Sequence, residues 1–378
     1  MSRTIIDIHV LQTVPPSNLN RDDTGSPKTA QYGGVRRARV SSQAWKRSTR
    51  AAFPSMLDAS ELGVRTKRII ELVSAEIKRI DAGLAEHADD YAKQTLELAG
   101  FKFAAPKKGE IPESSALTFL SAAQIGALAD AAVKSAGAGE GNFDTALKEL
   151  NVKAIADQKH SIDIALFGRM VADLPSFNVD AAAQVAHAIS VHAVDNEFDY
   201  FTAVDDAKDK SEGDDAGAAM IGTVEFNSAT LYRYATVDVD RLQDNLGDMQ
   251  ATRRAVDAFI RSFITSMPTG KQNTFANRTL PDAIVVSVSG KQSVNLAGAF
   301  EDAVQAGSAG GRIGLAAKQL AEHADQVHAA FGTAPERTWV VAVGAAVQPL
   351  AELGQHVSLD QLVDGLGDEV DRRLSGAA

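Results

Sequence analysis

The strongest constraint on the fold is that strand-like runs lie near both ends of the chain. Residues Thr4–Leu11 alternate apolar side chains with Asp7 and His9, which is typical of a strand with one buried face. Three later runs are strand-like as well, namely Phe226–Val237, Ala283–Ser289 and Thr338–Val343. A sheet built from these runs must therefore join residues that are far apart in the sequence.

Helical patterns occupy the middle of the chain and alternate with the later strands. Residues 60–178 have a helical pattern, with Ile69, Val73 and Ile77 on one face, and no convincing strand interrupts them. Further helical patterns follow at 250–266, 294–306, 312–331 and 358–374. At 378 residues the chain also exceeds the usual size of one domain. This order predicts an α+β fold, with an antiparallel RRM-like or ferredoxin-like sheet, helices on one of its faces and a large helical insertion.

The segment Glu197–Asn227 has a pattern of its own. Phe198, Tyr200 and Phe201 lead into a polar centre rich in Asp and Gly, and Met220 begins an apolar return. Such a centre cannot bury enough apolar surface to join a core. We therefore expect a long hairpin that protrudes from the sheet.

The charge of the chain is unevenly distributed. A net charge of −11 argues against a nucleic-acid partner, because phosphates are neutralised by Lys and Arg. Between Thr24 and Leu57, however, there are no acidic residues and seven basic ones: Lys28, Arg36, Arg37, Arg39, Lys46, Arg47 and Arg50. An extended run over Val35–Val40 sets Arg37 and Arg39 on a common face. The sequence therefore predicts a local basic surface on an acidic body.

A helix is expected from about Gln43 to Phe53, capped by Ser41 or Ser42. Gln43, Lys46, Arg47 and Arg50 fall at i, i+3, i+4 and i+7 and therefore form one stripe. The stripe suits a row of phosphates, since the free N–H groups of a helix N-terminus also attract anions. A solvated charged face without a ligand is the alternative.

Asp22 and Asp23 allow two interpretations. Paired carboxylates bind Mg²⁺ and serve nucleases, but in a loop rich in Pro and Gly they commonly make local turn hydrogen bonds. The turn role is favoured, because no further acidic cluster nearby completes a two-metal site. With eight scattered histidines and no cysteine, we expect neither a metal nor a cofactor.

Nothing in the sequence indicates a membrane. The chain has no apolar run approaching the roughly 18 residues of a spanning helix, and Met1 does not open a basic and apolar leader. Together with the lack of cysteine, this predicts a cytoplasmic protein without a membrane partner.

Six ordered sequence blocks resemble a known family. They are HVLQTVPPSNLNRDDTGSPKTAQYGGVRRARVSSQAWKR (9–47), DIALFGRM (163–170), AHAISVH (186–192), DYFTAVDD (199–206), FNSATLYRY (226–234) and KQNTFA (271–276). In this order they resemble the CasC-type backbone subunit of the type I-E CRISPR Cascade complex. Beyond about residue 300 there is little motif identity.

The resemblance implies an RRM-like palm, helical fingers and a thumb hairpin. The palm would comprise residues 1–58 and 226–378, the fingers with the return to the palm 59–196, and the thumb 197–225. In this family, copies stack into a helical filament along CRISPR RNA, and each thumb wedges between nucleotides. The implied partners are CRISPR RNA, target DNA through that RNA, further copies of the chain and other Cascade subunits.

Site residues are carried over motif by motif. The resemblance implies that Arg21, Lys28, Ser41, Gln43, Lys46 and Arg50 hold RNA phosphates. Met170 and Lys271 are weaker candidates for RNA binding, and Phe201, Thr202 and Val204 are implied as base-wedge residues. No catalytic residue is implied. Two alternatives remain open: an RNA-guided ribonuclease that uses a loop aspartate, and a general RNA-binding protein outside CRISPR defence.

Overall fold

The computed structural model describes residues 3–104, 111–138, 142–171, 174–203, 220–305 and 311–376. The chain divides into two compact units. The first contains residues 1–52, 185–236 and 259–369, and the second contains residues 53–184, 237–258 and 370–378. Each unit is therefore assembled from segments that are distant in the sequence.

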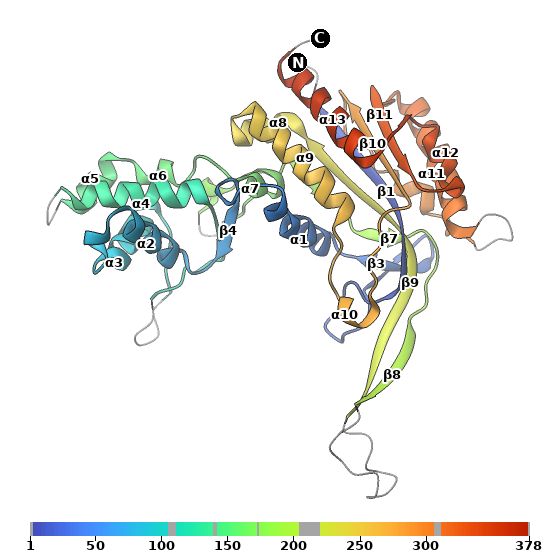
Figure 1. Ribbon diagram of the computed structural model, residues 1–378, viewed down its shortest axis with the longest axis horizontal. Helices are drawn as coiled ribbons and strands as arrows, with labels where there is room; N and C mark the ends of the chain where they lie inside the picture. The colour runs from blue at the N-terminus through green and yellow to red at the C-terminus, as the bar shows by residue number, and fades with distance from the viewer. Residues whose placement is uncertain are drawn as a thin grey trace, which may run out of the picture. The chain divides into compact units, whose positions relative to one another are not determined.

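A mixed sheet organises the first unit (Figure 1). Its order is β12 (Gln355–His356), β11 (Arg337–Ala342), β10 (Ala283–Ser289), β1 (Ile5–Ser17), β9 (Met220–Asp238), β7 (Ala188–Ser190), β3 (Val35–Val40) and β2 (Thr29–Tyr32). Two further strands pair with β9, namely β6 (Ala183–Val185) and β8 (Glu197–Ala203). The β11–β12 pair is parallel, whereas β1 pairs antiparallel with β10, with Ile5 opposite Ser289. The first strand therefore pairs with a strand that lies far along the chain.

Helices cover both faces of this sheet, so the expectation of helices on one face is wrong. On one face, Trp45 of α1 (Ser42–Ala52) contacts Phe263 of α9 (Met249–Thr265). On the other face, α11 (Gly311–Phe331) and the short helix η5 (Leu296–Phe300) pack against β1, β10 and β11. Figure 1 shows α11 with α12 (Gln348–Ala351) on the side of the sheet opposite α9 and α13 (Leu359–Leu374).

The second helical layer changes the environment of β1. Asp7 and His9, expected on a solvated face, are 6% and 5% exposed because η5 and α11 cover them. A strand with one buried face was therefore the wrong prediction, although the strand itself is confirmed. The predicted helix 294–306 is also wrong in extent, since its described part is helical only over Leu296–Phe300.

The second unit is mainly helical. One core joins α2 (Ile69–Ile80), α3 (Ala88–Ala99), α4 (Ala122–Ala136), α5 (Phe143–Glu149) and α6 (Val152–Ile155). The unit also contains α7 (Ile162–Phe167) and α8 (Val239–Leu246). A two-stranded sheet of β4 (Gly63–Thr66) and β5 (Thr118–Ser121) contradicts the expectation that no strand interrupts residues 60–178. The sequence pattern does not reveal β5, because this strand has only four residues and runs directly into α4, whose first turn Ser121 caps.

The hairpin is confirmed in the part of the chain that the structure describes. Strand β8 pairs antiparallel with the start of β9, from Glu197 opposite Phe226 to Ala203 opposite Met220. Figure 1 shows this ribbon extending beyond the rest of the sheet. The α+β fold class, with its RRM-like sheet, helical insertion and protruding hairpin, is therefore confirmed.

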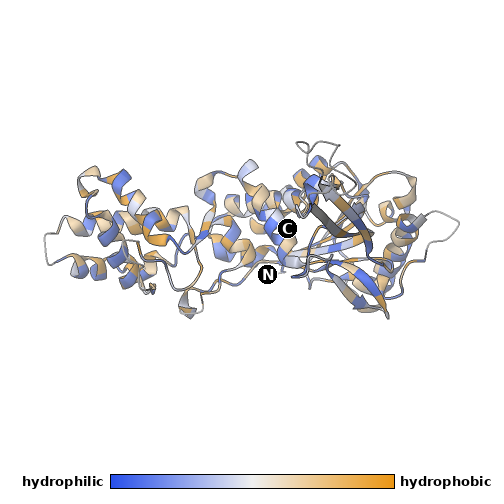
Figure 2. Cartoon of the chain, turned by 90° about the horizontal axis from the view of Figure 1, so that it is seen from below, coloured by the Kyte–Doolittle hydropathy of each residue, from blue (hydrophilic) through white to orange (hydrophobic). Residues whose placement is uncertain are grey.

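Hydrophilic residues interrupt the apolar ones along the helices (Figure 2). Among the described residues, no helix combines the length and the apolar character needed to cross a membrane.

Candidate nucleic-acid interface

The helix α1 presents cations above a buried aromatic side chain. The Ala44 N–H donates to Ser41 Oγ (3.2 Å), which caps the first turn. Trp45 is buried, Gln43 is exposed, and Lys46 and Arg50 are half-buried. Burial lowers the pKa of Lys46 below its usual value, so its ammonium is partly desolvated at the protein surface. Contacts of this ammonium with an anion are less screened than those of a fully exposed lysine.

A second, buried cation lies beneath α1. The Arg233 guanidinium is 3.7 Å from the ring centre of Trp45 and 4.5 Å from that of Phe263. It donates to Gln12 Oε1 (2.6 Å) and to the Phe263 carbonyl. Burial lowers the pKa of Arg233 to about 9, so the group remains protonated at neutral pH. Stacking of the Arg233 guanidinium on the Trp45 ring thus holds α1 against the sheet.

The loop before β2 holds its own shape. Asp22 Oδ1 accepts hydrogen bonds from Thr24 N (2.9 Å), Thr24 Oγ1 (2.7 Å) and Ser26 N (3.0 Å). These bonds lower the pKa of Asp22, with the Thr24 hydroxyl as the largest cause. A bridge between Arg21 and Pro27 closes the turn. The local turn role favoured for Asp22 is confirmed by these contacts.

The same loop is attached to the base of the hairpin. Asn18 Nδ2 donates to Gly25 O (3.0 Å) and to Glu225 O (2.9 Å), while Ser26 Oγ donates to Glu225 Oε1 (2.7 Å). Asn196 Nδ2 also donates to the second oxygen of that carboxylate (3.1 Å). The loop that carries Arg21 and Lys28 therefore shares a hydrogen-bond network with the start of β8 and with β9.

Lys271 approaches this loop from another part of the chain. It precedes α10 (Gln272–Phe275) with a left-handed φ of 50° and is half-buried. Its neighbour Gly270 lies so close to the Leu19 carbonyl that an added Cβ would stand 2.3 Å from that oxygen. A larger residue at 270 would therefore separate Lys271 from the loop.

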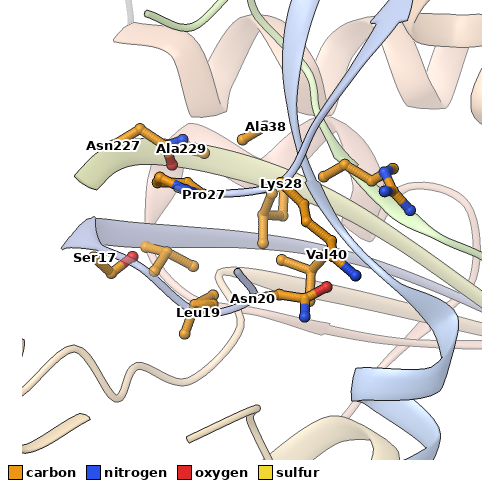
Figure 3. Close-up of a pocket in the computed structure, with 12 residues that line it drawn as sticks. Ser17, Leu19, Asn20, Pro27, Lys28, Ala38, Val40, Asn227 and Ala229 are labelled. Carbon is orange, nitrogen blue, oxygen red and sulfur yellow. The ribbon is translucent and has the colours of Figure 1, made fainter. Parts of the chain in front are cut away.

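A shallow pocket lies beside the loop that carries Lys28 (Figure 3). It has a cavity volume of about 20 Å³, which is room for one water molecule. The lining comes from the end of β1, the loop, β3 and β9, and includes Asn20, Lys28, Arg39, Val40 and Asn227. Figure 3 shows Lys28 and Asn20 among these residues. This pocket is too small to hold a nucleotide.

The sequence did not predict the part that His187 takes at this surface. Its Nδ1 accepts the Ser42 N–H at the start of α1 (2.9 Å), so the other ring nitrogen, Nε2, carries the proton. Burial, followed by the nearby cations Arg39 and Lys28, lowers the pKa of His187. A contact between residues 145 positions apart leaves no local signal in the sequence.

Arg37 does not belong to the basic surface. Arg37 and Arg39 lie on the same face of β3 as predicted, but the Arg37 side chain is buried rather than part of a basic surface. Its guanidinium donates to the carbonyls of Tyr32 (3.1 Å), Ser190 (3.1 Å), Phe300 (2.8 Å) and Glu301 (3.0 Å). Arg37 therefore ties β2, β7 and η5 together.

The hairpin presents aromatic side chains. Phe198 and Tyr200 are 70% and 71% exposed and lie on the same face of β8 as Thr202. Phe201 lies on the other face, with its ring against Gly222, where an added Cβ would meet it at 2.6 Å. Phe198 and Tyr200 were not among the predicted site residues, although their spacing of two in a polar strand indicates exposure. The predicted Val204 lies outside the described residues.

Met170 belongs to the second unit and is 82% exposed. The preceding residue, Arg169, is buried and donates to Phe177 O (2.7 Å) and Asp157 Oδ1 (3.0 Å). A two-way backbone bridge between Arg169 and Val179 fixes the same segment. The structure thus brings Arg21, Lys28, Ser41, Gln43, Lys46, Arg50 and Lys271 into the first unit and leaves Met170 in the other.

A metal site is not evident in the described part of the chain. No group of three or more His, Asp or Glu side chains there could hold an ion together.

This fold and surface define an α+β protein with an RRM-like sheet, a basic helix and a protruding ribbon. A family model described as CT1975-like protein, Cas_CT1975, matches residues 6–365. The chain belongs to this CT1975-like family. None of the curated protein sequences compared with the chain matches it significantly.

Solved structures agree with the family. One similar chain comes from a structure described as "CRISPR RNA-guided surveillance complex, pre-nicking". It is 35% identical with a TM-score of 0.81, and the match covers 97% of this chain and 100% of that one. Another, from a "CRISPR RNA-guided surveillance complex", is 31% identical with a TM-score of 0.71, covering 97% and 99%.

Proposed function

We propose that this protein is the CRISPR RNA-binding backbone subunit of a type I-E Cascade complex. The observation that carries the proposal is that one loop, which holds Arg21 and Lys28, contacts three other elements. It reaches the start of α1 through Asn20 and Ser41, the base of the hairpin through Asn18, and Gly270 beside Lys271 through Leu19. The similarity to chains of CRISPR RNA-guided surveillance complexes supports RNA and other subunits of such a complex as partners.

The proposed mode of binding is a grip on phosphates. Gln43, Lys46 and Arg50 offer N–H donors along one helix, and such donors hold phosphates without distinguishing bases. The same subunit can then coat any guide, while base pairing with target DNA supplies the specificity. In the proposed assembly, copies form a helical filament on the RNA, and Phe201, Thr202 and Val204 wedge between nucleotides so that the spacer bases are displayed.

We propose further that the chain is not an enzyme. A ribonuclease that uses Asp22 is the competing function, but the Asp22 carboxylate accepts three hydrogen bonds within its own loop. Cleavage of complementary RNA by the assembled complex with Mg²⁺, lost in Asp22→Ala or Asp23→Ala, would establish that alternative.

The proposal is tested by reversing the charge of α1. Lys46→Glu with Arg50→Glu should reduce co-purifying RNA at least about tenfold, because two phosphate contacts become repulsive. The matched control is Arg312→Glu with Lys318→Glu on α11, whose net charge change is identical and whose RNA content should be unchanged. Circular dichroism checks that both variants fold.

Sequencing of the recovered RNA distinguishes the remaining functions. A uniform class of spacer–repeat RNAs is expected from the wild-type protein. RNA of heterogeneous length without repeat-derived ends would indicate a general RNA-binding protein, and unchanged RNA in the α1 variant would refute the interface.

A further inference from the structure

A second cavity lies on the sheet face opposite α1. It has a volume of about 360 Å³, within the range of about 300–1,000 Å³ that is usual for small-molecule sites. Its walls come from β1, β10, β11, η5 and α11, and their apolar members include Val285, Leu296, Leu320 and Leu353. The cavity therefore offers an apolar volume that none of the proposed RNA contacts uses.

A neutral histidine forms part of the wall. His9 is buried, and its Nδ1 lies 2.9 Å from the Tyr232 hydroxyl. That hydroxyl also contacts Asn295 Oδ1 (3.2 Å) and accepts the Leu296 N–H (3.1 Å). Asn295 Oδ1 accepts the backbone N–H of Ala297 and, as an amide oxygen, can only accept.

These contacts determine the tautomer of His9. All of them are satisfied when the Tyr232 hydroxyl donates to Asn295 and His9 Nδ1 donates to Tyr232. His9 Nε2 then accepts hydrogen bonds. Burial lowers the pKa of His9 to about 3, so the ring stays neutral in the physiological range.

The carboxylates at the cavity are not matched by any lysine or arginine of its lining. Asp325 and Glu352 are among the lining residues, which include no lysine or arginine. His328, also in the lining, has its Nδ1 engaged with Thr333 Oγ1 (3.0 Å). Asp325 and Glu352 repel an anion that enters this cavity and attract a cation.

We propose that this cavity binds a small organic amine, with an apolar body against the aliphatic wall and a protonated amino group toward Asp325 and Glu352. The proposal goes beyond RNA binding and does not depend on it, because its residues lie on the other face of the sheet from Trp45 and Arg233.

Three probes that share a phenyl ring but differ in their polar group test this site: benzylamine, benzyl alcohol and benzoate. Isothermal titration calorimetry and thermal unfolding of the full chain should show benzylamine binding and raising the Tm in a concentration-dependent manner. Benzyl alcohol should bind more weakly, and benzoate should not bind. Equal binding of benzoate and benzylamine, or no binding of any probe, would overturn the proposal.

Variants locate the binding. Asp325→Asn with Glu352→Gln should weaken benzylamine about five- to tenfold, since exposed carboxylates contribute modestly. Ala324→Leu, which fills the apolar part of the cavity, should abolish it. Asp302→Asn with Glu322→Gln is the matched control, because it removes two carboxylates of the same unit that do not line the cavity. Unchanged affinity in both test variants would place the amine elsewhere and refute the site.

Discussion

Two polar groups buried on opposite faces of the central sheet differ in their charge state. Under α1, the Arg233 guanidinium, which is charged at neutral pH, is buried between Trp45 and Phe263. Under α11, His9 and Tyr232 are buried as neutral partners. The group buried between Trp45 and Phe263 therefore keeps its charge, whereas burial keeps the His9 ring neutral. The difference teaches that adjacent residues of one strand, such as Tyr232 and Arg233, can serve two chemically distinct cores.

The largest expected effect is at the charged face. Arg233→Ala should lower the free energy of unfolding by about 3 kcal/mol, because it leaves a cavity between two rings and an unpaired Gln12 oxygen. Chemical denaturation measures the loss. Arg233→Lys keeps the charge but not the planar stacking, so its free energy of unfolding should lie between those of Arg233→Ala and the wild type. A stability of Arg233→Ala equal to that of the wild type would contradict the role of this residue under α1.

At the neutral face, stability should depend on pH. His9 has a folded pKa of about 3, below its ordinary value of 6.5, so the unfolded chain binds a proton first as the pH falls. The contribution of neutral His9 to the free energy of unfolding is complete above about pH 6.5 and is lost toward pH 3. The free energy of unfolding falls over this range by up to about 1.4 kcal/mol per pH unit. Burial raises the pKa of Asp7, which opposes this loss at the acidic end.

Chemical denaturation of the wild type and of His9→Asn at several pH values isolates the pH dependence of stability that His9 causes. The amide can still donate to Tyr232, so the variant should remain folded with a shallower slope between pH 6.5 and 5. His160 and His192, whose pKa values burial also lowers, act in both proteins and cancel in the difference. Identical slopes would show that His9 is not buried as a neutral ring.

A smaller effect is expected at the start of α1. Ser41→Ala removes the acceptor of the Ala44 N–H and should destabilise the protein by about 1 kcal/mol. Ser41→Asp restores an acceptor and should recover most of that loss. An alanine variant as stable as the wild type would mean that the first turn of α1 is held without its cap.

The smallest effect on stability is expected outside both cores. Phe198→Ala with Tyr200→Ala removes exposed rings and should change the free energy of unfolding by less than about 0.5 kcal/mol. RNA content of the purified variant is the second measurement. A large loss of stability would show that these rings pack against the protein rather than face solvent.

Periodic features of the sequence predicted the fold well. The strand at Ala283–Ser289 and the cap at Ser41 follow from short-range pattern and chemistry, which tertiary contacts did not override. The expectation for Arg37 failed because alternation identifies a face but not what covers it, and η5 arrives from residues more than 250 positions away. The role of His187 could not be predicted for the same reason.

The pairing of β1 with β10 constrains the order in which the parts of the protein fold during synthesis. Ile5 reaches its partner Ser289 only after most of the chain has been synthesised, so the first strand waits unpaired on the ribosome. The core around α2, α3 and α4 spans Ile69–Phe177 and is complete long before. Helical, local contacts form quickly, whereas distant strand pairing is slow. During synthesis the helical core around α2, α3 and α4 can therefore fold before β1 pairs with β10.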